Sequence, residues 1–349
     1  MSDQNGNMKT IELHENGLDI QFRIRENGVV ELADLSSQEV KKAAMEPKED
    51  IYYPAVEIHR SGTGSLNMHA YKNNINQSSV DFVYEKHELK EQDGGKELEI
   101  VMVSPEKLKA IYHMRLFDGV PAVQTWTEIT NEGSEDQGLT YVSSFIYQGI
   151  SRGGDKPYYK KTDIYVPFNS WCCEAQWQKY DAETLNLNGM VVDGFNHQGY
   201  GLNRYCYSGK GTWSTCEYLP MGIAEDRETG ETYIFQVESS GQWLIEYGSA
   251  QGGNLYLTIS GATEQEHGWY KNLKPGECFT TVPAGAAVVK GGLNPAVAAL
   301  TRYRRKVRRA NPDDEKLNVV FNDYMNCLMG DPTTERELSI IDKAAELGC

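Results

Sequence analysis

Side chains that could do chemistry are plentiful in this sequence, but their spacing builds no catalytic or metal-binding motif. Asp and Glu together number 50, and in a β-rich protein such carboxylates ordinarily lie on the solvated surface. Nothing in the sequence pairs two of them for acid and base catalysis. The seven histidines are scattered, without a third ligand at the spacing of a zinc site. We therefore assign no catalytic residue and predict no metal and no cofactor.

The cysteines and the first residues indicate a cellular compartment. The seven cysteines are odd in number and form no Cys-x-x-Cys pair. The opening residues, MSDQNGNMKT, are polar and contain no apolar segment of a signal peptide. No run approaches the roughly 18 apolar residues that a membrane-spanning helix requires. We expect a cytoplasmic protein with reduced thiols.

The formal net charge of −16 restricts the partners. Binding to nucleic acid depends on cationic groups that release counterions from the phosphates, and the overall charge here opposes it. The same charge disfavours an anionic membrane surface. A neutral ligand such as a sugar is indifferent to the charge, so we expect neither nucleic acid nor membrane as a partner.

Aromatic residues offer one kind of binding chemistry. Residues 171–177 and 205–218 are rich in Trp and Tyr, and Trp213 lies in the second segment. Their flat apolar rings could stack on sugars, which makes these segments candidates for carbohydrate contact. The alternative is packing in the core or at the rim of a β-sandwich, which uses the same residue types.

The elements that position these residues are mainly strands. From about residue 8 to residue 290 the sequence consists of short β-like runs separated by turn residues. Residues 17–24 alternate strictly between apolar and polar, and residues 242–247 and 254–259 are rich in Trp, Tyr, Thr and Ile. Joining segments such as Glu-Asn-Gly and Asp-Gly are typical of hairpins. This pattern predicts a mainly β protein in which residues 1–293 form one large antiparallel β-sandwich.

The character of the sequence changes at residue 294. Asn294 and Pro295 suit the start of a helix, and apolar residues then recur at helical spacing at Val297, Leu300 and Tyr303. Residues 302–309 are strongly basic, and residues 311–312 read Asn-Pro, which ends a helix. We predict a helical linker over residues 294–316. Its basic end could be a nucleic-acid stripe, but a solvated end docked on acidic surface of the same protein is favoured.

Residues 317–349 predict a single βα unit. Residues 317–321 have the composition of a short buried strand, and a helix opens near Thr334, with Glu337 completing a capping box. Gly348 lies where a helix ends. In a parallel fold another strand must follow such a helix, so Cys349 looks like an interruption of an incomplete barrel.

The loop after the expected strand would then lie where barrel enzymes build active sites. Its candidate sugar-binding residues are Asn322, Asp323, Tyr324, Asn326 and Cys327. Packing is the alternative role of Tyr324.

Several of these segments together resemble a known family. The segments are residues 273–279, which read Leu-Lys-Pro-Gly-Glu-Cys-Phe, the basic helix, residues 318–324, and residues 342–348. In this order they resemble the family-36 glycoside hydrolases, the α-galactosidases or melibiases. The resemblance implies a β-supersandwich, like that of sugar mutarotases, followed by a linker helix and the first part of a (β/α)8 catalytic barrel. It also implies a terminal α-galactoside or related oligosaccharide as substrate and a homo-oligomer, because some relatives form tetramers.

The resemblance places the chemistry outside this chain and suggests one further contact within it. Family members use two aspartates on later barrel strands, which would lie beyond Cys349. Residues 50–55, which read Asp-Ile-Tyr-Tyr-Pro-Ala, are similar to a sandwich loop of the family that reaches a neighbouring active site. Asp50 matches that pattern, but Tyr52 replaces its arginine, so bidentate hydrogen bonding is lost there. Tyr324 likewise stands where the family commonly has tryptophan.

Two functions of different kinds therefore stay open. The first is the amino-terminal region of an α-galactosidase-type retaining hydrolase, with its catalytic aspartates missing and no activity of its own. The second is a non-catalytic carbohydrate-binding or oligomerisation module, whose loop at residues 50–55 is an ordinary start of a strand.

Overall fold

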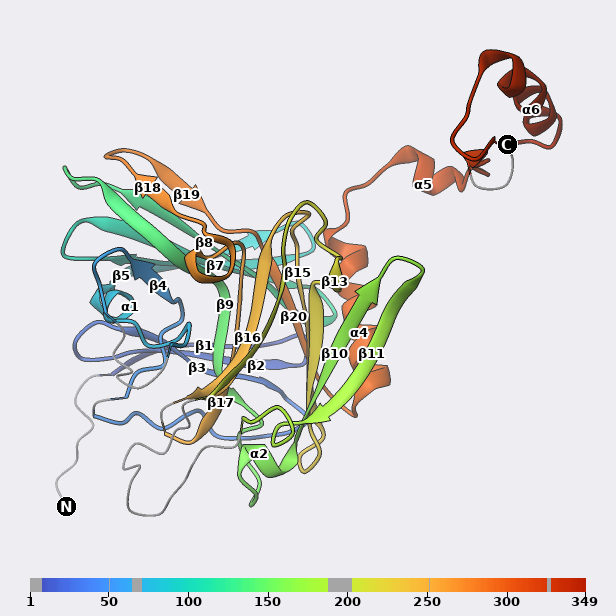
Figure 1. The fold of residues 1–349 in the computed structure, drawn as a ribbon. Helices are drawn as coiled ribbons and strands as arrows, with labels where there is room; N and C mark the ends of the chain where they lie inside the picture. Colours follow the sequence, from blue (N-terminus) through green and yellow to red (C-terminus); the bar gives the residue numbers. More distant parts are fainter. Residues whose placement is uncertain (1–7, 50, 65–70, 188–202, 251, 325–327) are drawn as a thin grey trace. The chain divides into compact units, whose positions relative to one another are not determined.

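The chain divides into two compact units, Met1–Lys306 and Val307–Cys349. A computed structural model describes residues 8–49, 51–64, 71–187, 203–250, 252–324 and 328–349. Within these residues every assigned strand belongs to the first unit, and Figure 1 shows how the strands stack in layers there.

The largest sheet has 11 strands, and all of its described pairings are antiparallel. Its main path runs β11-β10-β14-β15-β20-β8-β7-β6-β5, while β13 pairs with β10 and β19 pairs with β8. The strands are β5 (Val83–Gln92), β6 (Gly95–Val103), β7 (Leu108–Phe117), β8 (Val120–Asn131), β10 (Thr162–Ser170), β11 (Cys173–Asp181), β13 (Glu217–Tyr218), β14 (Met221–Asp226), β15 (Glu231–Val237), β19 (Cys278–Thr280) and β20 (Ala284–Lys290).

Two smaller antiparallel sheets complete the first unit. The 6-stranded sheet runs β12-β16-β17-β9-β18, with β4 also paired to β9, and the 3-stranded sheet runs β1-β2-β3. The elements are β1 (Lys9–Glu15), β2 (Leu18–Ile24), β3 (Val30–Ser37), β4 (Ile58–Arg60), β9 (Gln137–Ile150), β12 (Arg204–Gly209), β16 (Trp243–Ala250), β17 (Asn254–Ser260) and β18 (Lys271–Leu273), with short helices α1 (Gln77–Asp81), α2 (Tyr158–Lys161) and α3 (Glu264–His267).

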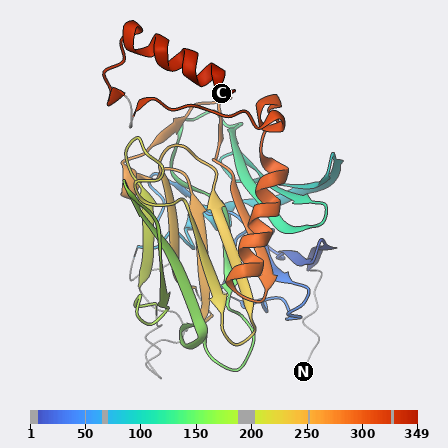
Figure 2. The same ribbon diagram turned by 90° about the vertical axis from the view of Figure 1, so that its right-hand side faces the viewer.

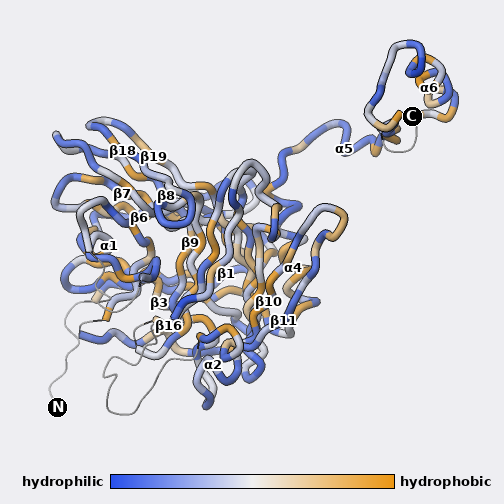
Figure 3. The backbone as a smooth tube through the Cα atoms, viewed as in Figure 1, coloured by the Kyte–Doolittle hydropathy of each residue, from blue (hydrophilic) through white to orange (hydrophobic). Residues whose placement is uncertain are grey.

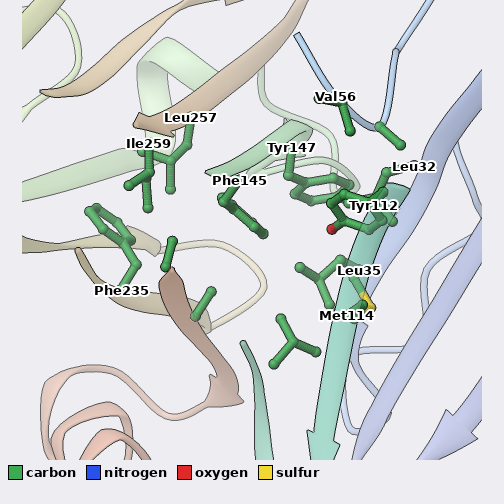
Figure 4. Packing of buried hydrophobic residues seen from close by; sticks show 14 of the residues in the cluster. Leu32, Leu35, Val56, Tyr112, Met114, Phe145, Tyr147, Phe235, Leu257 and Ile259 are labelled. Atoms are coloured by element: carbon green, nitrogen blue, oxygen red, sulfur yellow. The ribbon is translucent and has the colours of Figure 1, made fainter. Parts of the chain in front are cut away.

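One hydrophobic core lies between the sheets. Buried side chains from β3, β7, β9, β15 and β17 meet in it, as Figure 4 shows for Leu32, Tyr112, Phe145, Phe235 and Leu257. Period-two alternation explains which residues enter the core; in β8, for example, buried and half-exposed positions alternate along most of the strand. Figure 3 shows the apolar stretches gathered along the strands. The predicted mainly β fold with large antiparallel sheets is confirmed.

Helix α4 (Leu293–Val307) covers part of the 11-stranded sheet, as Figure 2 shows. Its buried residues Ala296, Ala299, Leu300 and Tyr303 recur at helical spacing. Val297, expected on the same face, is instead exposed. The small side chains of Ala296 and Ala299 let α4 approach the sheet closely on the face that carries them. The buried face of α4 is therefore rotated away from the face that the larger apolar residues predicted.

The second unit contains α5 (Pro312–Lys316) and α6 (Thr334–Glu346). The side chain of Thr333 caps α6 by accepting a hydrogen bond from the backbone N–H of Arg336. Residues 317–321, predicted as a strand, are instead exposed and without regular structure. A parallel strand is stable only beside a hydrogen-bonded neighbour, and none is present among the described residues of this unit. Asn311 and Pro312, expected to end a helix, begin α5.

No helix in the described part of the chain has both the length and the apolar character to cross a bilayer.

Candidate functional site

A polar hollow of about 660 Å³ adjoins the loop that contains Tyr52. Its walls come from the start of the described chain, from the β2–β3 turn and from the loop itself. They consist of Met8, Arg25, Glu26, Asn27, Pro47, Lys48, Glu49 and Tyr52. Asp50, the other residue predicted in this loop, lies outside the described residues.

Arg25 holds the loop in place. Its Nη2 donates a hydrogen bond to the backbone oxygen of Lys48 at 2.7 Å, and its Nη1 donates to the backbone oxygen of Ile51 at 3.2 Å. The guanidinium also lies over the Tyr52 ring, 5.1 Å from its centroid. Asn27 donates from Nδ2 to the Tyr52 hydroxyl at 3.1 Å. The ring of Tyr52 is therefore fixed by two side chains that come from the β2–β3 turn.

A buried carboxylate, Glu31 on β3, anchors this arrangement. Glu31 is 0% exposed, and its Oε2 accepts from Arg23 Nε at 2.7 Å. Its Oε1 accepts from Arg25 Nη1 at 3.2 Å and from the backbone N–H of Tyr53 at 3.1 Å. Two cations and a backbone N–H share this one desolvated carboxylate. The positions of the β2–β3 turn and of the loop at Tyr52, which form two walls of the hollow, therefore both depend on Glu31.

The third predicted residue of the first unit, Trp213, lies on a different surface. It is 64% exposed in the turn between β12 and β13, and Trp171, at the tip of the β10–β11 hairpin, is 81% exposed. The two turns touch, because Asn169 donates from Nδ2 to the backbone oxygen of Thr215 at 2.5 Å. The buried Trp243 donates from Nε1 to the backbone oxygen of Ser214 at 2.7 Å, which fixes the turn from beneath.

The two aromatic segments predicted as sugar contacts thus divide into exposed and packed residues. Tyr207 is buried and packs edge-on against Trp243, 5.9 Å between ring centroids. Trp171 and Trp213 instead leave flat faces in water on adjoining turns. Such faces can stack on the apolar side of a sugar ring, while backbone groups of the turns supply hydrogen bonds. Trp171 and Trp213 are called the tryptophan surface below.

In the second unit, Asp323 and Tyr324 lie in a loop closed by backbone hydrogen bonds. The N–H of Leu328 donates to the oxygen of Asp323 at 3.1 Å, and the N–H of Met329 donates to the oxygen of Tyr324 at 2.7 Å. A hydrogen bond between the carboxyl groups of Asp323 and Glu337 raises the pKa of Glu337. The Tyr324 ring is exposed. Asn326 and Cys327 lie outside the described residues.

Within the first unit, the structure does not bring Tyr52 and Trp213 into one site. The hollow at Tyr52 and the tryptophan surface share no lining residue, and Asp323 and Tyr324 belong to the other unit. Sequence reasoning missed the roles of Arg25 and Asn27. The Glu-Asn-Gly turn after Arg25 was predictable as part of a hairpin. The contacts of Arg25 and Asn27 with the loop 23 to 27 residues further along the chain were not.

Solved structures with a similar fold include family-36 α-galactosidases. AgaB from Geobacillus stearothermophilus is 15% identical with a TM-score of 0.70, covering 97% of this chain and 48% of its own. An α-galactosidase from Lactobacillus brevis is 15% identical with a TM-score of 0.67, covering 97% and 47%. An AgaA variant of G. stearothermophilus in complex with raffinose is 14% identical with a TM-score of 0.67, covering 97% and 49%. No family model and no curated protein matches the sequence.

These likenesses define a fold class: antiparallel β-sheets in a large sandwich, continued by a helix. Within that class, the chain has the fold of part of a family-36 α-galactosidase and spans about half the length of the solved α-galactosidases it matches.

Proposed function

We propose that this chain forms the amino-terminal, non-catalytic part of an α-galactosidase-type retaining glycoside hydrolase. The likeness of 97% of the chain to about half of a solved α-galactosidase carries this proposal. Retaining hydrolysis requires two carboxyl groups about 5–5.5 Å apart, one as nucleophile and one as acid and base. We place that pair in the half of the α-galactosidase fold that this chain does not span.

An assay with a nitrophenyl α-galactoside tests the proposal. The pure chain is expected to release no nitrophenol above the buffer rate. Activity that scales with protein concentration and co-elutes with the chain in gel filtration would show a complete catalytic site and overturn the proposal.

The tryptophan surface favours a role in sugar binding, in the intact hydrolase or as a separate module. The ligand class is an α-galactoside such as raffinose, the sugar bound in one of the solved α-galactosidases. Trp171 and Trp213 are too exposed to act as core residues, and two large aromatic faces in water typically mark a binding surface.

Substitution of Trp213 tests this binding role. Stacking on one ring contributes about 0.5–1.5 kcal/mol, so Trp213→Ala is expected to weaken raffinose binding roughly threefold to tenfold. Isothermal titration calorimetry measures the affinity, and Tyr270→Ala, which removes an exposed aromatic residue elsewhere, serves as the control. Equal affinities in all three proteins would exclude the tryptophan surface as the sugar site.

We further propose a cytoplasmic homo-oligomer. The cysteines of the described residues are free, as is typical of a reducing compartment. Light scattering on the pure chain tests the oligomer, and a mass of one chain at micromolar concentration would contradict it.

A further inference from the structure

A cluster of one histidine and three glutamates lies on the 11-stranded sheet, outside both candidate sugar surfaces. The antiparallel register places His113 of β7 directly opposite Glu99 of β6 and Trp126 of β8. Glu97 is two residues from Glu99, so the period of two puts both carboxylates on the face that carries the His113 ring. Glu128 follows Trp126 by two residues on the same face of β8.

The distances within the cluster suit a metal ion. His113 Nδ1 lies 2.9 Å from Glu97 Oε1 and 3.9 Å from Glu99 Oε1, and one ligand atom from each residue lies within 4.8 Å of the others. Nitrogen and oxygen ligands at about 2.0–2.2 Å in a tetrahedral zinc site are separated by roughly 3.4 Å. The two separations from Nδ1 lie on either side of this value, and ligand atoms up to 4.8 Å apart would have to approach by up to roughly 1.4 Å. Binding of the ion would replace the hydrogen bond between Nδ1 and Glu97 Oε1.

The imidazole of His113 is buried and stacked on an aromatic ring. Its side chain is only 8% exposed, and its ring stacks on Trp126 with 4.6 Å between centroids and 6° between planes. Nε2 is buried without a hydrogen-bond partner and lies 3.8 Å from Glu128 Oε1. A cation on Nδ1 would fix the proton on Nε2, which could then donate to Glu128. That carboxylate–histidine–metal arrangement orients ligands in known zinc sites.

Three other polar side chains lie near the cluster, and one of them, Arg115, has a buried Nε without a hydrogen-bond partner. Lys90 Nζ lies 2.5 Å from Glu99 Oε1, but its side chain is partly exposed and free to turn into solvent. Gln92 donates from Nε2 to Glu97 Oε2 at 2.7 Å and leaves Oε1 for a cation. Arg115, opposite Glu97 in the register, donates instead to the backbone oxygen of Asp93 at 3.4 Å.

We propose that Glu97, Glu99 and His113 bind a divalent transition-metal ion, with Glu128 as the outer partner of the imidazole. An imidazole with two carboxylates is a donor set suited to Zn²⁺, whereas Mg²⁺ and Ca²⁺ take oxygen ligands and more of them. The ion would join β6 to β7 near the edge of the sheet. The proposed metal site does not depend on the proposed sugar binding, so a negative result for one proposal does not affect the other.

Calorimetric titration of the metal-free chain with ZnCl₂ tests the site. The exposed thiols are first alkylated with iodoacetamide, because cysteines also bind zinc. One Zn²⁺ per chain is expected, with no binding of Mg²⁺ at the same concentrations. His113→Gln and Glu99→Gln are each expected to weaken Zn²⁺ binding at least tenfold, and Glu128→Gln about tenfold.

His14→Gln is the matched control, since His14 also lies beside two carboxylates, Asp19 at 2.7 Å and Glu12 at 3.8 Å, but on an exposed surface. Its Zn²⁺ affinity is expected to equal that of the wild type. Urea unfolding of each metal-free variant checks folding, and Glu99→Gln, whose side chain is partly exposed, keeps the test valid should His113→Gln fail to fold. Absence of Zn²⁺ binding after alkylation, or equal losses in His14→Gln and His113→Gln, would overturn the proposal.

Discussion

At the scale of single residues, the most consequential group is the buried carboxylate of Glu31. Glu31→Gln is expected to lower the free energy of unfolding by about 3–5 kcal/mol, because it leaves the buried Arg23 without its counter-charge. Urea unfolding followed by circular dichroism measures the change. Glu26→Gln, in the exposed wall of the same hollow, should change stability by less than about 0.5 kcal/mol. A loss below about 1 kcal/mol for Glu31→Gln would mean that the loop does not depend on this ion pair.

Cys206 gives a second residue-scale prediction. Burial raises the pKa of its thiol to about 11, although Arg204 opposes the shift. Thiolate is the reactive form, so the raised pKa makes Cys206 roughly a hundredfold less reactive at pH 8 than an ordinary thiol. Peptide mass spectrometry after timed exposure to iodoacetamide measures the rates, with the exposed Cys216 as reference. Similar rates at the two cysteines would contradict the burial of Cys206.

The role of Tyr52 and Trp213 as sugar contacts stays a prediction. Both side chains are partly or largely exposed, which binding requires. The partners of Tyr52 were not predictable, because Arg25 reaches the loop only through the packing of β2 and β3. The cluster at His113 was missed for the same reason: Glu97 and Glu99 show the spacing of two on one strand, but the register that brings His113 opposite is a property of the sheet.

At the scale of elements, the contact of α4 with the 11-stranded sheet depends on a glycine. A Cβ at Gly285 on β20 would lie 2.5 Å from the ring of Tyr303, which packs there edge-on to Phe117. Gly285→Ala is therefore expected to destabilise the protein by about 1–3 kcal/mol through overpacking. Thermal unfolding measures it, and Gly64→Ala, whose added Cβ meets no atom within 4 Å, is the control. Equal melting temperatures for the two variants would show that α4 packs more loosely.

Element prediction succeeded where local pattern and tertiary environment agree. The strands of the sandwich follow period-two alternation because each has one buried face, and α6 begins within a residue of its predicted start because Thr333 provides a cap. Residues 317–321 failed because an apolar run specifies a strand only when a neighbouring strand accepts its hydrogen bonds. Composition could not reveal whether such a neighbour exists.

At the scale of the whole molecule, stability resides in the first unit. The core side chains of the described residues all precede Lys306, and α6 contains no buried residue. A chain that ends at residue 310 is therefore expected to melt within about 2 °C of the full chain, as differential scanning calorimetry can measure. A chain that ends at residue 292 loses α4 and should melt distinctly lower. A large drop already at residue 310 would show that the second unit contributes to the core.

We propose that this sandwich binds α-galactosides without cleaving them. Saturation-transfer NMR on the pure chain with raffinose observes both properties in one sample. Magnetisation is expected to transfer to the galactosyl protons, less so in Trp213→Ala, while the raffinose signals stay intact for hours. Accumulation of free galactose, or no transfer at millimolar raffinose, would contradict it.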